Sequence, residues 1–67
     1  MNWDQIEGRW KQFKGSAQTK WGQLTDDELT RSAGQREHLA GLLQERYGYA
    51  KEQVNKEIDE FARELKL

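Results

Sequence analysis

Residues 10–29, WKQFKGSAQTKWGQLTDDEL, hold two of the three tryptophans of this 67-residue chain and its clearest helix boundary. Gly22 is followed by Thr25 and, three residues later, by Glu28. This is the capping-box pattern, in which the threonine hydroxyl accepts the N3 amide and the glutamate accepts the threonine amide. We therefore predict that one helix ends at Gly22, in the left-handed conformation that glycine favours, and that the next begins after Thr25.

Upstream of this boundary, large apolar residues recur every three or four positions, which is the period of one helical face. The first helix is predicted over residues 3–22, with Asn2 as its N-cap. Gly8, Gly15 and Gly22 fall on the opposite face. An interior glycine costs up to about 1 kcal/mol relative to alanine, so we expect a bend at Gly15. The stripe consists of Trp3, Ile6, Trp10, Phe13, Ala17, Trp21 and Leu24, whose large members are expected in the core.

Three further helices are predicted downstream, over residues 26–32, 35–47 and 50–65. The third is expected to end at Gly48, a glycine placed directly after an apolar face. The fourth has the most regular apolar stripe of the chain. The core residues expected from these helices are Leu29, Leu39, Leu42, Leu43, Tyr47, Val54, Ile58, Phe61 and Leu65.

No window of the sequence alternates like a β-strand, so the predicted fold is all-α. Four helices with short connections favour two crossed helical hairpins in a single domain, residues 1–67. A chain of 67 residues can bury only a small core. Because it contains no cysteine, it has neither a disulfide nor a thiolate metal site.

Charge is abundant and balanced: 11 lysines and arginines against 12 aspartates and glutamates give a net charge of −1. Asp59 and Arg63 are spaced for an ion pair within the fourth helix. The mean hydropathy is only −1.16, but low net charge and periodic tryptophans indicate a folded chain. The start of the chain lacks the features of a signal peptide, and no segment is long enough to span a membrane. We therefore expect a cytoplasmic protein.

Three blocks of the sequence are similar to a known family. GRWKQFKG (8–15), WGQLTDDEL (21–29) and ERYGYAKEQVNKEI (45–58) together resemble the CsbD-like family of small bacterial general stress proteins. The resemblance covers nearly the whole chain. It implies a helical domain of the SAM-like type, with two orthogonal hairpins, and expression under general stress control. It implies no established molecular activity, cofactor or catalytic residue.

Three polar features are candidate sites, and each also has a simpler structural interpretation. The basic segment 9–20, interleaved with aromatic residues, is a pattern typical of nucleic-acid binding. Its charges flank the apolar stripe on both sides, however, and the pI of about 5.8 disfavours that function. The acidic run 26–28 lacks the ligand spacing of a calcium loop and suits the positive end of a helix. The single histidine, His38, has no cysteine partner, so neither a metal nor a cofactor is expected.

The sequence Tyr47-Gly48-Tyr49 contains the candidate for contact with a partner. Tyr47 is assigned to the core and Gly48 to a helix end, which leaves Tyr49 as an exposed aromatic residue. Ser16 and Ser32 have no base near them in the sequence, and no phosphate-binding glycine loop is present. We therefore expect a protein without catalytic activity.

Two kinds of function remain open. The first is a folded interaction module that binds an unidentified protein partner or a second copy of itself. The second is a hydrophilic protectant that acts by abundance. Changing Tyr49 should abolish binding by a module, whereas a protectant should keep an aggregating client soluble without its surface aromatics. Binding of the first helix to a membrane surface, and weak binding of nucleic acid, are lesser alternatives.

Overall fold

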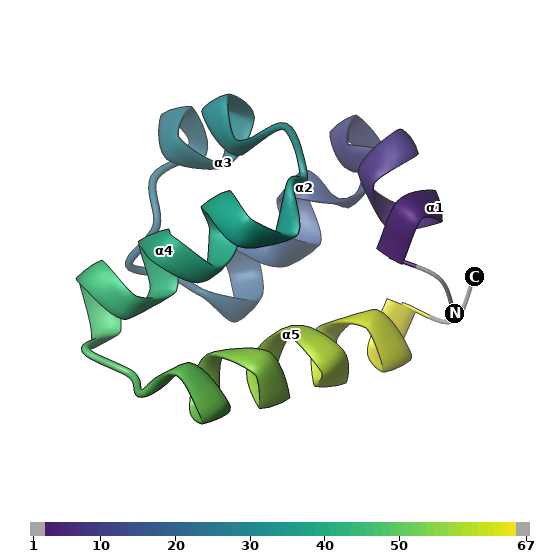
Figure 1. Cartoon of the computed structure of the whole chain (residues 1–67). Helices are drawn as coiled ribbons and strands as arrows, with labels where there is room; N and C mark the ends of the chain where they lie inside the picture. The colour runs from purple at the N-terminus through teal and green to yellow at the C-terminus, as the bar shows by residue number, and fades with distance from the viewer. Residues whose placement is uncertain (1–2, 66–67) are drawn as a thin grey trace.

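The computed structural model describes residues 3–65, and within that range it contains five α-helices and no β-strand (Figure 1). The all-α prediction is confirmed. The second predicted helix has the bounds expected, and the last two begin one residue later than expected. Asn2, the expected N-cap, lies outside the described residues. The helices are α1 (Trp3–Gly8), α2 (Trp10–Lys20), α3 (Asp26–Ser32), α4 (Arg36–Tyr47) and α5 (Lys51–Leu65).

The helices pair as two hairpins. α2 packs mainly against α3, and α4 packs mainly against α5. Figure 1 shows α4 and α5 lying one above the other and running in opposite directions. Contacts between α3 and α4 join one hairpin to the other. The predicted arrangement in helical hairpins is therefore confirmed.

One apolar core lies between the two hairpins. The ring centroids of Trp21 and Phe61 are 5.0 Å apart, so these two aromatic residues connect the end of α2 to α5. Four of the predicted core residues, Trp3, Leu42, Tyr47 and Leu65, are half-buried at its edge. The buried apolar residues are Ile6, Trp10, Phe13, Ala17, Trp21, Leu24, Leu29, Leu39, Leu43, Val54, Ile58 and Phe61.

The predicted first helix is broken, so the expectation of one helix over residues 3–22 is wrong. α1 ends at Gly8, and Arg9 has φ −118° and ψ 28°, outside the helical region. Gly15, where a bend was expected, lies instead inside the uninterrupted helix α2. The break therefore falls at the first of the three regularly spaced glycines.

Two indole rings explain why the chain bends there, because one bonds to the last turn of α3 and the other to the loop that directly follows it. Trp10 Nε1 donates to Leu29 O at 2.7 Å, and Trp3 Nε1 donates to Gly34 O at 2.8 Å. These carbonyls lie where the helix leaves backbone acceptors without helical partners. A straight helix would separate Trp3 and Trp10 by about 10 Å along its axis. In the bent chain their ring centroids are 6.4 Å apart, and both indoles reach the same turn.

Gly22 does not end α2 in the left-handed conformation, and that prediction is wrong. Among the described residues, the glycines with positive φ are Gly34 and Gly48. The chain leaves the helix at Trp21, which has φ −117° and ψ 76°. The amide of Leu24 then donates to Trp21 O at 3.0 Å. Since Trp21 and Leu24 are both buried around this turn, their packing ends the helix.

Contacts at its two ends fix the α4–α5 hairpin. Gly48 ends α4 as predicted, with φ 69° and its amide donating to Gln44 O at 2.9 Å. At the other end, Arg36 Nη2 donates to Asp59 Oδ1 at 2.8 Å. The expected Asp59–Arg63 pair is absent, because Asp59 bonds to the facing helix instead.

Candidate interaction surface

The predicted capping box at the start of α3 is present, and it is linked to α4. Thr25 Oγ1 accepts the Glu28 amide at 3.1 Å, and Glu28 Oε1 accepts the Thr25 amide at 3.0 Å. The second carboxylate oxygen of Glu28 accepts from the guanidinium of Arg46. One carboxylate therefore closes the cap of α3 and joins it to α4.

These donors lower the pKa of Glu28 from its ordinary value of 4.5. The Thr25 backbone amide is the largest cause; partial burial opposes it, and Arg46 lowers the pKa further. Because the folded pKa is the lower one, the unfolded chain binds this proton first as the pH falls. The stabilisation is therefore complete above about pH 4.5 and is lost as the pH falls through the folded pKa.

We expect the Glu28→Gln variant to lose less stability on acidification than the parent. Between about pH 6 and pH 3, the parent should show a steeper fall in Tm, since only the parent loses the Glu28 charge. Circular-dichroism melts across this range measure the difference. The control is Glu52→Gln, an exposed glutamate on α5, which should fall as steeply as the parent. Parallel curves for the parent and Glu28→Gln would contradict the linkage.

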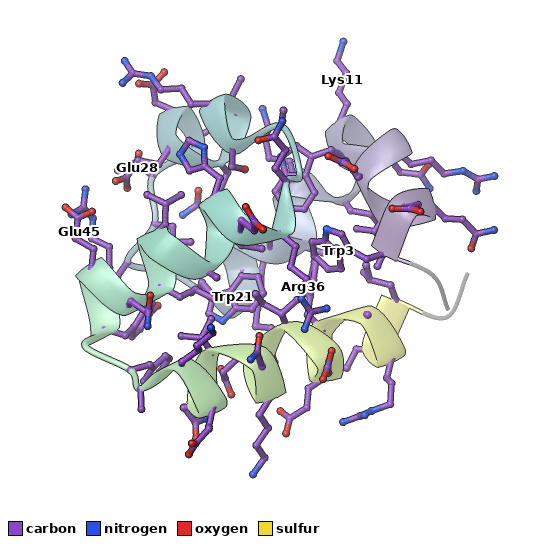
Figure 2. All side chains as sticks on the ribbon, viewed as in Figure 1. Trp3, Lys11, Trp21, Glu28, Arg36 and Glu45 are labelled. Carbon is purple, nitrogen blue, oxygen red and sulfur yellow. The ribbon has the colours of Figure 1, made fainter. Side chains whose placement is uncertain are left out.

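The basic residues of α2 do not form a single patch. Lys14 Nζ lies 3.2 Å from Asp26 Oδ1 of α3, and Lys20 Nζ lies 3.3 Å from Glu64 Oε1 of α5. Lys11 points away from the rest of the molecule (Figure 2). Two of these cations thus hold α2 against its neighbours, so they present no continuous positive surface to a phosphate backbone.

Each carboxylate of the acidic run 26–28 faces its own base, so the three do not converge on one point. Within residues 3–65, no group of three or more acidic or histidine side chains is placed to hold a metal ion. His38 is exposed on α4. The pairs are Asp26–Lys14, Asp27–Arg31 and Glu28–Arg46.

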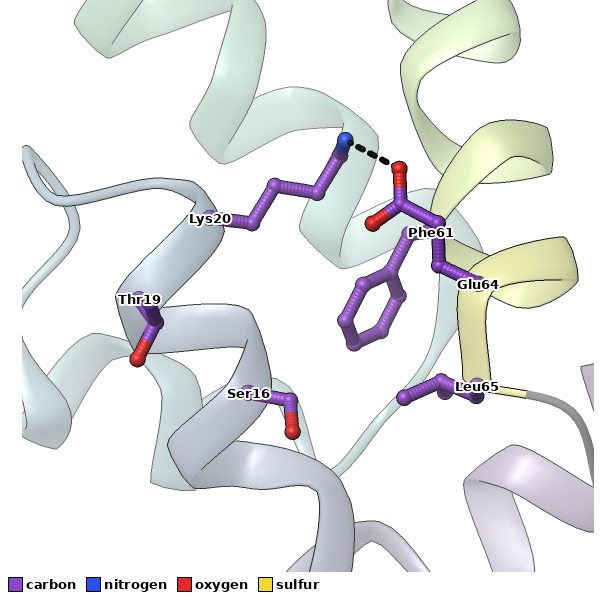
Figure 3. A pocket seen from close by; sticks show the side chains of 6 residues that line it. All are labelled: Ser16, Thr19, Lys20, Phe61, Glu64 and Leu65. Carbon is purple, nitrogen blue, oxygen red and sulfur yellow. Dashed lines mark hydrogen bonds and ion pairs between the residues drawn. The ribbon is translucent and has the colours of Figure 1, made fainter.

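A pocket of about 370 Å³ lies between α2 and α5 (Figure 3). Figure 3 shows Lys20 and Glu64 joined across it, with the Phe61 ring between the two helices. Ser16 also lines this pocket, but in the described part of the chain its hydroxyl makes no hydrogen bond to either charged group. A serine nucleophile needs a base within hydrogen-bond reach, and the pocket does not supply one.

The α2–α3 loop meets the α4–α5 connection at a cluster that we call the Tyr47–Tyr49 site, which consists of Gln23, Tyr47 and Tyr49. The rings of Tyr47 and Tyr49 are stacked, with centroids 5.1 Å apart and planes 9° from parallel. The Tyr47 hydroxyl accepts the Gln23 amide at 3.2 Å. Because Tyr47 is fixed at both its ring and its hydroxyl, it holds Tyr49 in one orientation at the surface.

The structure places Tyr49 differently from a freely exposed aromatic. It is half-buried, and it packs against the edge of the core as well as against Tyr47. The sequence could not predict the contact of Tyr47 with Gln23, since the donor is a backbone amide 24 positions away. Gly48, between the two tyrosines, ends α4 as the sequence predicted.

No helix within residues 3–65 combines the length and the apolar character that crossing a bilayer demands. The described residues thus form a small, charge-rich, all-helical protein whose distinctive surface feature is an ordered pair of tyrosines.

The chain belongs to the CsbD-like family, whose model matches residues 4–56. It is 59% identical over 61 residues to a UPF0337 protein of Bordetella pertussis, covering 91% of this chain and 92% of that relative. It is 56% identical over 66 residues to a UPF0337 protein of Rhodopseudomonas palustris, covering 98% and 100%. The UPF0337 protein YjbJ of Escherichia coli K12 is 53% identical over 58 residues, covering 87% and 84%. These names state no molecular activity.

Proposed function

We propose that this protein is a folded, non-catalytic interaction module of the bacterial stress response, acting in the cytoplasm through a protein partner. The stress role rests on membership of the CsbD-like family. The observation that carries the interaction role is the stacked Tyr47–Tyr49 pair. A rigid aromatic side chain is a favourable interface anchor, because little conformational freedom is lost when it binds.

The remaining surface supports a role without chemistry. Two cations of α2, Lys14 and Lys20, are paired with carboxylates, and the serine in the α2–α5 pocket has no hydrogen-bonded base. Titratable groups placed for acid–base catalysis lie within hydrogen-bond reach of a reacting group, and they commonly have strongly shifted pKa values. The shifted pKa of Glu28 is explained by its role as a helix cap.

We expect a photo-crosslinking phenylalanine analogue at position 49 to form discrete adducts in stressed bacterial cells. The analogue should occupy the place of the Tyr49 ring, next to the protein partner that covers the Tyr47–Tyr49 site. The matched control carries the same group at Gln53, an exposed position of α5, and should give no such adduct. An excess of the Tyr49→Phe protein, which keeps the ring and its stacking, should compete for the partner and reduce the amount of adduct. An excess of Tyr49→Ser should not. Equal labelling at both positions would contradict the proposal.

A hydrophilic protectant is the second candidate, favoured by the charged fraction of 34% and by the mean hydropathy of −1.16. Such a protein works through solvation, so it should keep a heat-aggregating client soluble whether or not Tyr49 is present. Light scattering of a client enzyme with the parent and with Tyr49→Ser separates the two functions. Equal protection by both proteins, together with no adduct at position 49, would favour the protectant.

A further inference from the structure

A groove of about 610 Å³ lies between α4 and α5, on the face of the hairpin seen in Figure 2. Its floor is small and apolar, formed by Ala40 and Gly41 of α4 and by the buried residue Val54 of α5. Figure 2 shows Arg36 reaching from α4 towards α5, where its bond to Asp59 bridges the two helices. The tyrosine pair takes no part in lining this groove.

The fold of one chain does not require the glycine at position 41. It lies inside α4 without a positive φ, and a Cβ added there would meet nothing within 4 Å. Glycine is among the least favourable residues inside a helix. What its absent side chain does provide is an open groove, in which another backbone can approach α4 closely.

Two charged side chains at opposite ends of the groove have no ion-pair partner within residues 3–65. Glu37 lies in the first turn of α4, and Lys51 is the first residue of α5. Because the two helices run in opposite directions, the first turn of one is far from the first turn of the other. The groove therefore has a free negative charge at one end and a free positive charge at the other.

This pattern is complementary to itself. In a two-fold symmetric dimer, a residue i that contacts residue j of the partner is repeated by j contacting i. If the two-fold axis lies in the plane of the interface and crosses the groove near Gly41 at a right angle to the helices, Glu37 of each copy faces Lys51 of the other. The close approach takes place at the glycine, and both unpaired charges find a partner. We propose that the groove between α4 and α5 binds a second copy of this chain, forming a symmetric dimer.

The size of the molecule indicates a weak, reversible dimer. Its accessible surface is 4338 Å², whereas a standard interface takes roughly 800 Å² from each partner, close to a fifth of that surface. Eight of the described residues line the groove, whereas a standard interface uses roughly 20–30 residues of each partner, which places the dimer among transient complexes. We therefore expect a dimer dissociation constant, Kd, between about 10 µM and 1 mM. The Kd should rise as salt screens the rim charges.

Charge reversal tests the geometry directly. Glu37→Lys alone would set lysine against lysine twice, and Lys51→Glu alone would set glutamate against glutamate twice. The Kd of each single variant should be about tenfold higher than that of the parent. An equimolar mixture of the two variants restores both opposite-charge pairs in a heterodimer, and its Kd should return to within about threefold of the parent value. Sedimentation velocity over the stated concentrations measures all four samples.

Two controls separate this dimer from other outcomes. Glu52→Lys with Lys56→Glu reverses exposed charges of α5 that do not line the groove and should leave the dimer unchanged. Gly41→Leu should raise the Tm, since leucine favours a helix, but should abolish the dimer by filling the groove. A parent that stays monomeric to about 1 mM would overturn the proposal. So would a dimer that survives Gly41→Leu, because that dimer would use another face. The photo-crosslinking experiment at the Tyr47–Tyr49 site can succeed or fail independently of either result.

Discussion

Replacing Trp10 with alanine is expected to lower the Tm by more than about 10 °C. Trp10 is 6% exposed, and truncating a buried tryptophan costs about 3–5 kcal/mol. A chain of 67 residues has a total stability of about 3–10 kcal/mol. The substitution also removes the donor to Leu29 O, at the end of α3. The loss is therefore a large part of the stability of the domain.

Circular-dichroism melts and urea titration of the Trp10 variants measure this loss. Trp10→Phe should lie between the parent and Trp10→Ala, because it keeps a ring but no indole N–H. Its Leu29 carbonyl still accepts the Ser32 hydroxyl at 2.7 Å, so the lost hydrogen bond should cost only about 1 kcal/mol. The neighbouring Lys11→Ala is the surface control and should stay within about 0.5 kcal/mol of the parent. A parent-like melt for Trp10→Ala would contradict the core assignment.

Replacing Gly34 with alanine is expected to destabilise the protein strongly, although it adds only one methyl group. Gly34 has φ +78°, a conformation that costs an L-residue about 1–2 kcal/mol. A Cβ there would lie 3.0 Å from Trp10 Cγ and 3.1 Å from the Cα atom of Glu7. The first atom belongs to the Trp10 indole, which is hydrogen-bonded to Leu29, and the second belongs to the backbone. Neither atom can therefore move away easily. With the crowding, the total cost should be about 2–4 kcal/mol.

Gly15→Ala is the matched control for Gly34→Ala. Gly15 is exposed inside α2, and a Cβ added there would meet nothing within 4 Å. Alanine should therefore stabilise the protein by up to about 1 kcal/mol. The same substitution thus has opposite signs at two glycines of one chain. A second comparison, Gly34→Asn, separates strain from crowding, because asparagine tolerates the left-handed conformation but still brings a Cβ. Destabilisation by Gly15→Ala as large as that of Gly34→Ala would refute this explanation.

The three blocks that carry the family resemblance meet one another in the fold. The first block contains Trp10, whose indole bonds to Leu29 in the second block. The second also contains Gln23, whose amide bonds to Tyr47 in the third. One of these contacts lies within the first hairpin, and the other joins the first hairpin to the second. Tyr49 also lies in the third block, and its ring stacks on that of Tyr47 at the surface, which is why it carries the proposed interaction.

Local signals were sufficient wherever one short segment decides its own conformation. The capping box at Thr25 and Glu28 was predictable, because the groups that bond lie three residues apart. The stop at Gly48 was predictable for the same reason, since a left-handed glycine closes the last turn of its own helix. The burial of the apolar stripes followed from their helical period and the size of their side chains.

Local signals failed where distant segments compete. The glycine spacing led us to expect a bend at Gly15, but the break falls after Gly8 because the indoles of Trp3 and Trp10 bond to the end of α3 and to the loop that follows it. Local spacing favoured Asp59 with Arg63, but the facing helix supplies Arg36 at 2.8 Å. The special role of Gly34 was also hidden, because it depends on how closely Trp10 and Glu7 approach it.

The amino-acid sequence by itself determined that the chain is helical, where most helices begin and end, and which side chains avoid water. These properties depend on residues within a few positions of one another. The tertiary structure alone decided the bend of the first helix, the turn held by Trp3 and Trp10, the Tyr47–Tyr49 site and the groove over Gly41. Each brings together groups from different helices, and their distances are fixed only when the two hairpins pack.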